Sequence, residues 1–172
     1  MMGRLRRIVY VVVCLIAAVM LAACARPSQN NHNAATSNSA QGNTAASTDG
    51  TPPLLREINA GNEEGAKQLI ESGANVNAAN ESGVTPLMNA AGMGRKELVQ
   101  LLIARGANVN AKASGNFTAL MQAALVGQTD IIKILLDAGA DPSVKDVAGK
   151  TALTYAEEKN HKDIAALLKS KK

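Results

Sequence analysis

Side chains that could take part in covalent or metal chemistry are few in this chain of 172 residues. Its two cysteines are Cys14 and Cys24, and a thiol can serve as a nucleophile, a metal ligand or an attachment point. The two histidines, His32 and His161, do not have the spacing of a metal-binding pair. Cys24, at the end of an apolar run, is therefore the position where we most expect covalent chemistry.

No other pattern indicates catalysis. Glu63-Glu64 and Glu157-Glu158 are adjacent pairs, and we interpret them as solvated charges because neighbouring residues do not share a helix face. No glycine-rich phosphate loop follows a strand-like segment. The sequence predicts a protein that is not an enzyme and that has no cofactor and no metal site.

The element that would position Cys24 is an export signal. Residues 1–7 carry three arginines and no acidic residue, and residues 8–23 are 16 residues without a charge. That run is shorter than the ~20 apolar residues that span a bilayer core, which favours a signal peptide over a transmembrane helix.

The four residues Leu21-Ala22-Ala23-Cys24 resemble the lipobox of bacterial lipoproteins. The resemblance implies cleavage between Ala23 and Cys24, a diacylglycerol on the Cys24 thiol, an acylated amino terminus and membrane attachment through this lipid. The alternative is an ordinary signal peptide cut near Ala25 and a chance cysteine. If Cys14 leaves with the signal and Cys24 is acylated, no cysteine remains for a disulfide.

The resemblance also implies a location in the cell envelope. In Gram-negative lipoproteins an aspartate after the cysteine tends to retain the protein in the inner membrane, and here that residue is Ala25. We therefore expect the periplasmic face of the outer membrane. In a Gram-positive cell the protein would lie on the outer face of the plasma membrane.

Residues 24–50 follow as a linker. The segment from Ala25 to Gly50 is rich in Asn, Ser, Thr, Ala and Gln and lacks Leu, Ile, Val and aromatic residues, so we expect a disordered tether. Its end-to-end distance as a coil would be about 30 Å. Without residues 1–23 the chain has 15 basic and 14 acidic residues, which does not suggest a nucleic-acid partner.

Residues 51–172 contain a repeat with a spacing of 33 residues. TPLMNAAGMGRKELVQLLIARGANVNA begins at Thr85, TALMQAALVGQTDIIKILLDAGADPSV begins at Thr118, and a related segment begins at Thr151. An earlier copy, from Pro52, keeps the same phase. These segments resemble the ankyrin repeat. The resemblance implies an all-α solenoid of about four helix-turn-helix repeats with hairpin loops, at 52–84, 85–117, 118–150 and 151–172.

Local rules agree with this assignment. Thr85, Thr118 and Thr151 can cap the first helix of each repeat, and Pro86 suits the first helical turn. We expect positive φ at the glycines that end the helices and at the turns of the hairpin loops. We therefore expect it at Gly94, Gly127, Gly106 and Gly139, at the turn residues Gly83 and Gly149, and at Asn116, which takes the turn position in the loop before Thr118.

The terminal repeats depart from the pattern, as expected for caps that face solvent. The first repeat has Glu57-Ile58 in place of Ala-Ala and Gly65 in a column of leucine and isoleucine. Because a glycine in the middle of a helix costs about 1 kcal/mol relative to alanine, we expect this repeat to be the loosest. The fourth repeat has Glu157 and ends in lysines.

The ankyrin resemblance implies an unidentified protein partner, bound in a concave groove between the hairpin tips and the first helices. It gives His161 a structural role. The family's variable contact positions include Val147 and Lys150, in the loop before Thr151, and Lys159 in the fourth repeat. The candidate contact residues are Val84, Met93, Phe117 (expected at a loop tip), Gln122, Leu125, Val126 and Tyr155. Leu125, Val126 and Tyr155 could instead pack between neighbouring repeats.

The sequence thus predicts a monomeric, membrane-anchored and non-catalytic protein-binding module of the bacterial envelope. Two alternatives stay open. One is an immunity, inhibitor or oxidative-stress accessory lipoprotein, and the other is a purely structural lipoprotein of the envelope. Nothing in the residues selects between these roles or names the partner.

Overall fold

The computed structural model describes residues 50–171, so the predicted signal segment and residues 24–49 of the predicted linker lie outside it. The described residues form eight α-helices and one 3₁₀ turn and contain no strand. The helices are α2 (Pro53–Asn59), α3 (Glu63–Glu71), α4 (Pro86–Gly92), α5 (Lys96–Ala104), α6 (Ala119–Val126), α7 (Thr129–Asp137), α8 (Ala152–Glu158) and α9 (Lys162–Lys169), and the 3₁₀ turn is η2 (Ser114–Asn116).

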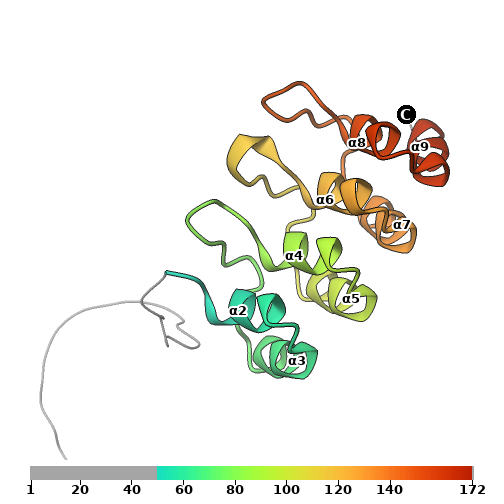
Figure 1. Ribbon diagram of the computed structural model, residues 1–172. Coiled ribbons are helices and arrows are strands. Elements are labelled where there is room, and N and C mark those ends of the chain that lie inside the picture. The colour runs from blue at the N-terminus through green and yellow to red at the C-terminus, as the bar shows by residue number, and fades with distance from the viewer. Residues whose placement is uncertain (1–49, 172) are drawn as a thin grey trace, which may run out of the picture. The chain divides into compact units, whose positions relative to one another are not determined.

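The helices form four pairs that stack in sequence order, which confirms the predicted all-helical repeat architecture (Figure 1). Within each repeat the first helix packs on the second. The first helices α2, α4, α6 and α8 form one layer, and the second helices α3, α5, α7 and α9 form another. The loops between repeats project to one side of the stack (Figure 1). None of the helices in this part of the chain has both the length and the hydropathy needed to cross a bilayer.

The predicted threonine caps are confirmed. The hydroxyl oxygens of Thr85, Thr118 and Thr151 accept hydrogen bonds from backbone N–H groups three residues later, at 3.3–3.4 Å. Pro86 is the first residue of α4, where its missing N–H leaves no bond unmade. These contacts fix where each first helix begins and therefore which of its residues face outward.

The glycines after the first helices have two functions. Gly94 and Gly127 have φ of 75° and 92°, as predicted, and Asn160 takes the same left-handed conformation with φ of 61°. A Cβ at Gly94 would lie 2.8 Å from the side chain of Gln128, and one at Gly127 would lie 2.7 Å from the ring of His161. Each glycine therefore turns the chain and admits a side chain from the next repeat. The packing of His161 on Gly127 agrees with a structural role for this histidine.

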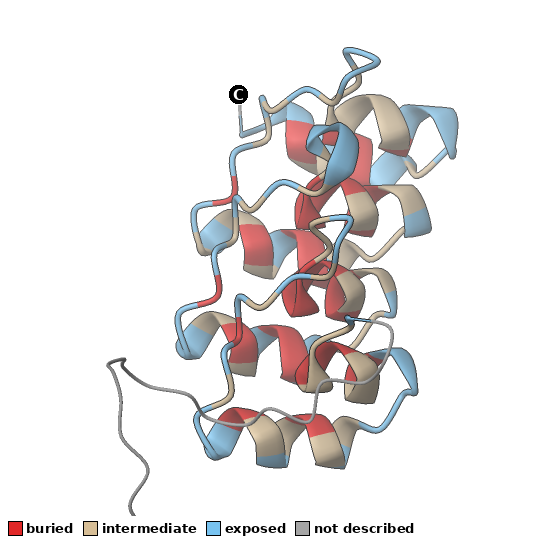
Figure 2. Ribbon diagram, turned by 90° about the vertical axis from the view of Figure 1, so that its left-hand side faces the viewer, coloured by how far each residue is buried: buried red, intermediate tan, exposed pale blue. Residues whose placement is uncertain are grey.

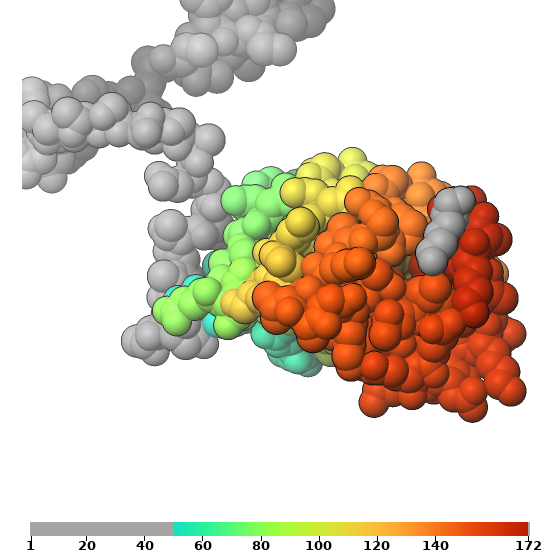
Figure 3. All heavy atoms as spheres, turned by 90° about the horizontal axis from the view of Figure 1, so that it is seen from above, coloured from blue at the N-terminus to red at the C-terminus, as the bar shows by residue number. Residues whose placement is uncertain are grey.

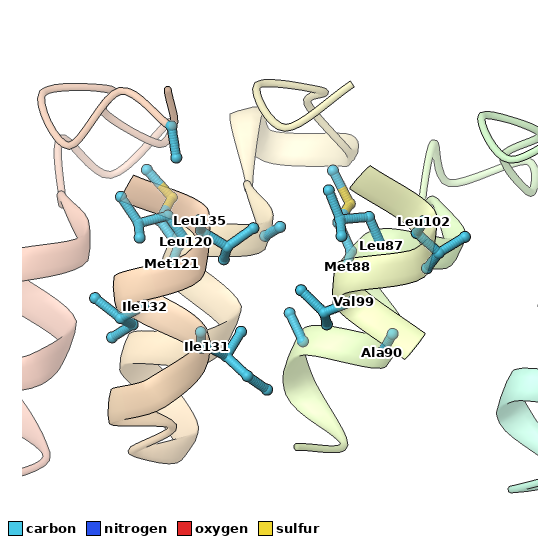
Figure 4. Close-up of a cluster of buried hydrophobic side chains, with 14 of the residues drawn as sticks. Leu87, Met88, Ala90, Val99, Leu102, Leu120, Met121, Ile131, Ile132 and Leu135 are labelled. Atoms are coloured by element: carbon cyan, nitrogen blue, oxygen red, sulfur yellow. The ribbon is translucent and has the colours of Figure 1, made fainter. Parts of the chain in front are cut away.

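The core lies between the two helix layers and between successive repeats (Figure 2). Leucines from both helices of the inner repeats fill it, and Figure 4 shows Leu87 and Leu102 of the second repeat and Leu120 and Leu135 of the third. Each of these side chains is at most 1% exposed. The alanine pairs 90–91 and 123–124 are fully buried, and their small size lets the first helices approach closely.

Two asparagines connect successive repeats through their backbones. Asn77 donates to the carbonyl oxygen of Gly106 at 3.0 Å and accepts from the N–H of Asn108 at 2.8 Å. Asn110 makes the same two bonds to Gly139 and Asp141, at 3.0 and 2.8 Å. These bonds set the position of each loop on the next, in addition to the apolar packing.

The first repeat ends the stack with polar groups. The prediction that Gly65 lies in the middle of a helix was wrong, whereas the expected looseness of this repeat stays a prediction. Gly65 is the third residue of α3 rather than a residue in the middle of a helix, and its N–H donates to the Asn62 side chain that caps this helix. Asn62 Nδ2 also donates to Glu57 Oε2 at 2.6 Å. A Cβ at Gly65 would lie 2.5 Å from Asn62 Nδ2 and 2.7 Å from Glu57 Oε2, so the glycine leaves room for this bond.

The outer face of the fourth repeat, turned to the viewer in Figure 3, is also polar. Glu157 and Lys169 occupy columns that hold Ala124 and Leu136 in the third repeat, and they form an ion pair at 2.8 Å. Thr154, in a column of methionines, completes a capping box with Thr151. This face thus has polar groups where inner repeats have apolar side chains, as the sequence predicted for a cap.

Candidate protein-binding face

The hairpin loops have the same frame in three repeats. We call residues 80–84, 113–117 and 146–150 the fingers. In each finger the first residue's N–H donates to the last residue's carbonyl oxygen, at 2.9–3.1 Å. Gly83, Asn116 and Gly149 have positive φ of 60–77°, as predicted. In the first and third fingers a side-chain acceptor, Asn80 or Asp146, also receives two backbone N–H groups.

Backbone hydrogen bonds join the fingers to one another. The N–H of Ser114 donates to the carbonyl oxygen of Ser82 at 2.8 Å, and its hydroxyl donates to the same oxygen at 2.9 Å. The N–H of Val147 donates to the carbonyl oxygen of Gly115 at 3.0 Å. The middle finger has Ala113 in place of a side-chain acceptor, and these contacts with both neighbours hold it. The three fingers therefore form one connected surface.

The predicted place of Phe117 was wrong. The tip of the middle finger is η2, and Phe117 follows it, directly before the cap residue Thr118. Its half-buried ring packs on the core and meets the ring of Tyr155 edge to face, with centroids 5.5 Å apart and planes at 79°. The contact brings together two residues that the sequence predicted separately. It also shows that part of each aromatic ring packs between repeats.

Tyr155 also fixes the last finger. Its hydroxyl donates to Asp146 Oδ2 at 2.5 Å, while Asp146 Oδ1 accepts from the N–H groups of Ala148 and Lys150. The bond from Tyr155, followed by the backbone N–H groups, lowers the pKa of Asp146, because all of them favour the carboxylate. The same bond raises the pKa of Tyr155 to about 12. The phenol therefore stays protonated and donating at neutral pH.

Lys150 and Glu158 form a charged rim beside this contact. Lys150 Nζ lies 2.7 and 2.8 Å from the two carboxylate oxygens of Glu158 and 5.5 Å from the centre of the Tyr155 ring. Both side chains are more than a third exposed. Solvent screens such a pair, so it orients the side chains more than it adds stability.

Outward positions of the first helices continue the surface. Gln122 lies over Gly92 of the preceding repeat, where a Cβ would come within 2.7 Å of the Gln122 amide. Asn89 also reaches the preceding repeat, where its side-chain amide donates a hydrogen bond to Asn59. Leu125 is half-buried. Gln122 thus packs between repeats. The sequence had left this role open for Leu125, Val126 and Tyr155.

Two predicted contact residues are well exposed. Met93 is 41% exposed at the end of α4, and Val126 is 46% exposed at the end of α6. Val84 is half-buried and packs against the core. We use "candidate face" for the fingers together with these outward positions of α4, α6 and α8. It contains all seven residues that the sequence proposed, in different degrees of exposure.

Comparison with known proteins settles the family. A family model for ankyrin repeats matches the chain in three overlapping copies, over residues 19–113, 54–146 and 112–172. The chain is an ankyrin repeat protein. A search of curated proteins found no significant match. Ankyrin repeats are a protein-interaction module and generally a non-catalytic scaffold. Membership in this family supports that general function.

One more residue of this ankyrin repeat protein exposes a large apolar side chain on the candidate face. Val147, at the tip of the last finger, is 80% exposed, the highest value for a large apolar side chain in residues 50–171. It occupies a variable family position but was not among the candidate contact residues. Its position after Lys145 and Asp146, in a polar loop, gave no separate signal of exposure.

The residues described contain no cluster of metal-ligating side chains. In that part of the ankyrin chain no three His, Cys, Asp or Glu side chains converge on a point where a metal could bind. Cys24 and Ala23, the residues of the predicted lipidation and cleavage site, lie outside the described residues. The arrangement of the candidate face suits contact with another surface.

Proposed function

We propose that this ankyrin repeat protein is a lipid-anchored, non-catalytic protein-binding module of the bacterial envelope and that it engages a partner protein through the candidate face. One observation carries the binding half. The large apolar side chains that are exposed in residues 50–171 are Met93, Val126 and Val147, and all three lie on this face. The location of all three exposed apolar side chains on the candidate face supports an interaction site there.

The fold keeps this face in one shape. The fingers are joined by backbone bonds, the Tyr155–Asp146 bond ties the last finger to α8, and the first helices are packed in one layer. A partner that binds a preformed surface loses less free energy to ordering that surface. The geometry therefore supports recognition by a preformed surface.

The envelope half rests on the sequence. The lipobox-like segment before Cys24 and the polar linker 24–50 support a lipid anchor with a tether. The proposed location is the periplasmic face of the outer membrane in a Gram-negative cell. The polar groups on both outer faces of the stack support a monomer, because end-to-end stacking would bury the Glu157–Lys169 pair.

The binding half is tested by cross-linking in intact cells. A tag in the linker recovers the chain with its partner, and the captured protein is identified by mass spectrometry. We expect Met93→Asp and Val126→Asp together to abolish capture with an unchanged helical circular dichroism signal, because both side chains are exposed. Val84→Glu and Phe117→Glu should also abolish it, although both residues are half-buried and their folding must be checked.

Gln100→Asp, on the exposed side of α5, is the matched control and should leave capture intact. Capture that persists in the Met93 and Val126 double variant would show that the partner binds elsewhere.

The envelope half is tested by mass spectrometry of the matured chain. We expect it to begin at Cys24 with a thioether-linked diacylglycerol, and Cys24→Ser should release the protein from the membrane fraction. A mature chain with an unmodified thiol, or an unchanged distribution of the Cys24→Ser protein, would remove the anchor from the proposal.

A further inference from the structure

The candidate face contains one series of equivalent positions in three successive repeats. Met93 caps the C-terminal end of α4, Val126 is the last residue of α6, and Lys159 caps the C-terminal end of α8. The three residues are 33 positions apart in the sequence, and α6 packs between α4 and α8. We call these three residues the terminal row.

The terminal row combines two apolar groups and one cation. Met93 and Val126 are both more than 40% exposed, and the half-buried Leu125 adjoins Val126 in the chain. Lys159 is exposed, and its side chain has neither an ion-pair nor a hydrogen-bond partner in the part of the chain that the structure describes. Its neighbour Lys150, in contrast, is paired with Glu158. The charge of Lys159 is therefore available to a ligand.

The spacing of the row selects the kind of segment that could match it. The axes of packed helices lie about 8–10 Å apart, so successive row residues are about 10 Å apart. In an α-helix, residues seven positions apart lie on one face and are about 10.5 Å apart along the axis. In an extended strand, side chains on one face are about 6.8 or 13.6 Å apart, and neither value fits.

We propose that the terminal row binds an amphipathic helix of a protein partner, with apolar side chains at positions i and i+7 and a carboxylate at position i+14. This inference rests on the proposed function and names the segment that the candidate face recognises. The two apolar side chains contact Met93 and Val126, and the carboxylate pairs with Lys159.

The charges of the stack set the direction of the bound helix. The first repeat, residues 52–84, contains five acidic and two basic residues, whereas residues 151–172 contain three acidic and five basic residues. The N-terminal end of a helix carries partial positive charge and its C-terminal end partial negative charge. The helix therefore lies with its N-terminal end at the first repeat and its C-terminal end beside Lys159.

A displayed library of amphipathic helical peptides, randomised over one whole face, tests the proposal on the full chain in mild detergent. Counter-selection uses the chain with Met93→Asp and Val126→Asp. We expect the selected peptides to share large apolar residues seven positions apart and an Asp or Glu seven positions further toward the C-terminus. Another spacing, extended binders, or no binders that discriminate against the variant would overturn the proposal.

A charge exchange tests the contact with Lys159. Lys159→Glu should weaken a selected peptide about fivefold to tenfold, as expected when an exposed attraction becomes a repulsion. Replacing the peptide's acidic residue with lysine should restore binding to the variant. Lys133→Glu changes the net charge equally but lies on α7, in the second-helix layer, and should have little effect. Equal weakening by both substitutions, or no restoration, would refute the pairing.

The two proposals can fail separately. If cellular capture depends on Met93 and Val126 while the peptides lack the seven-residue pattern, the helix inference is wrong and the binding function stands. If capture does not depend on the candidate face at all, the proposed function fails whatever the peptides show.

Discussion

Replacement of Gly127 by alanine is a direct test of how the repeats stack. Gly127 has φ of 92°, and a Cβ there would lie 2.7 Å from the His161 ring of the next repeat. Gly139 is a matched control, because it has φ of 87° and nothing within 4 Å of the position that a Cβ would take. The two substitutions therefore share the backbone penalty and differ in crowding.

The expected magnitudes follow from these two terms. A left-handed conformation costs a residue with a Cβ about 1–2 kcal/mol, and the stiffer unfolded chain returns about 0.4–1 kcal/mol. Gly139→Ala should thus lower the free energy of unfolding by about 1 kcal/mol. Gly127→Ala adds a steric overlap with His161, and overpacking costs about 1–3 kcal/mol, so we expect a loss of about 2–4 kcal/mol.

Urea unfolding followed by far-ultraviolet circular dichroism measures both values on the full chain. A double-mutant cycle with His161→Ala then isolates the crowding, because removal of the ring should leave Gly127→Ala about as costly as Gly139→Ala. Equal losses in the two single variants, or no coupling between positions 127 and 161, would show that His161 does not lie against Gly127.

Three further outcomes are expected. Tyr155→Phe should raise the pKa of Asp146 toward its ordinary value, which NMR titration of the carboxyl group measures. The Tyr155–Asp146 bond stabilises the fold above the unfolded-state pKa of Asp146 and is lost as pH falls through the lowered pKa. The bond is also lost at high pH, as Tyr155 ionises near its pKa of about 12. An unchanged Asp146 titration would contradict this. Gly65→Ala should lower the thermal midpoint despite the better helix propensity of alanine, because its Cβ would displace the Asn62–Glu57 bond; a raised midpoint would refute that reading. Asn110→Ala removes two bonds between repeats and should cost about 1–2 kcal/mol in urea unfolding, whereas no loss would mean that these exposed bonds do not hold the loops.

The helix boundaries could be predicted because their causes are local. A threonine before an apolar turn caps a helix wherever it occurs, and Thr85, Thr118 and Thr151 recur with the repeat. A glycine or asparagine at a fixed offset gives the positive φ that the turn needs, as at Gly127 and Asn160. The repetition of these short signals made the architecture predictable.

The predictions for Gly65 and Phe117 were wrong because both positions depend on side-chain contacts that the sequence does not show. The cost assigned to Gly65 assumed an isolated helix, whereas its environment is set by Glu57 and Asn62. Phe117 was placed at a loop tip because it lies in a polar loop, but its ring packs on Tyr155 of α8. Both errors arise where side chains of different elements meet. The proposed lipid site at Cys24 is a short chemical motif, and it stays a prediction.

The distribution of polar groups over the stack restricts where a partner can gain free energy. On the first repeat, Glu57 and Asn62 occupy the end of the stack, and on the fourth the Glu157–Lys169 pair does. Burying those groups would cost the hydration of charges with little apolar surface in return. Met93 and Val126, in contrast, expose apolar surface whose removal from water is favourable by about 25 cal/mol per Å². Association driven by apolar burial should therefore favour the candidate face over either end of the stack.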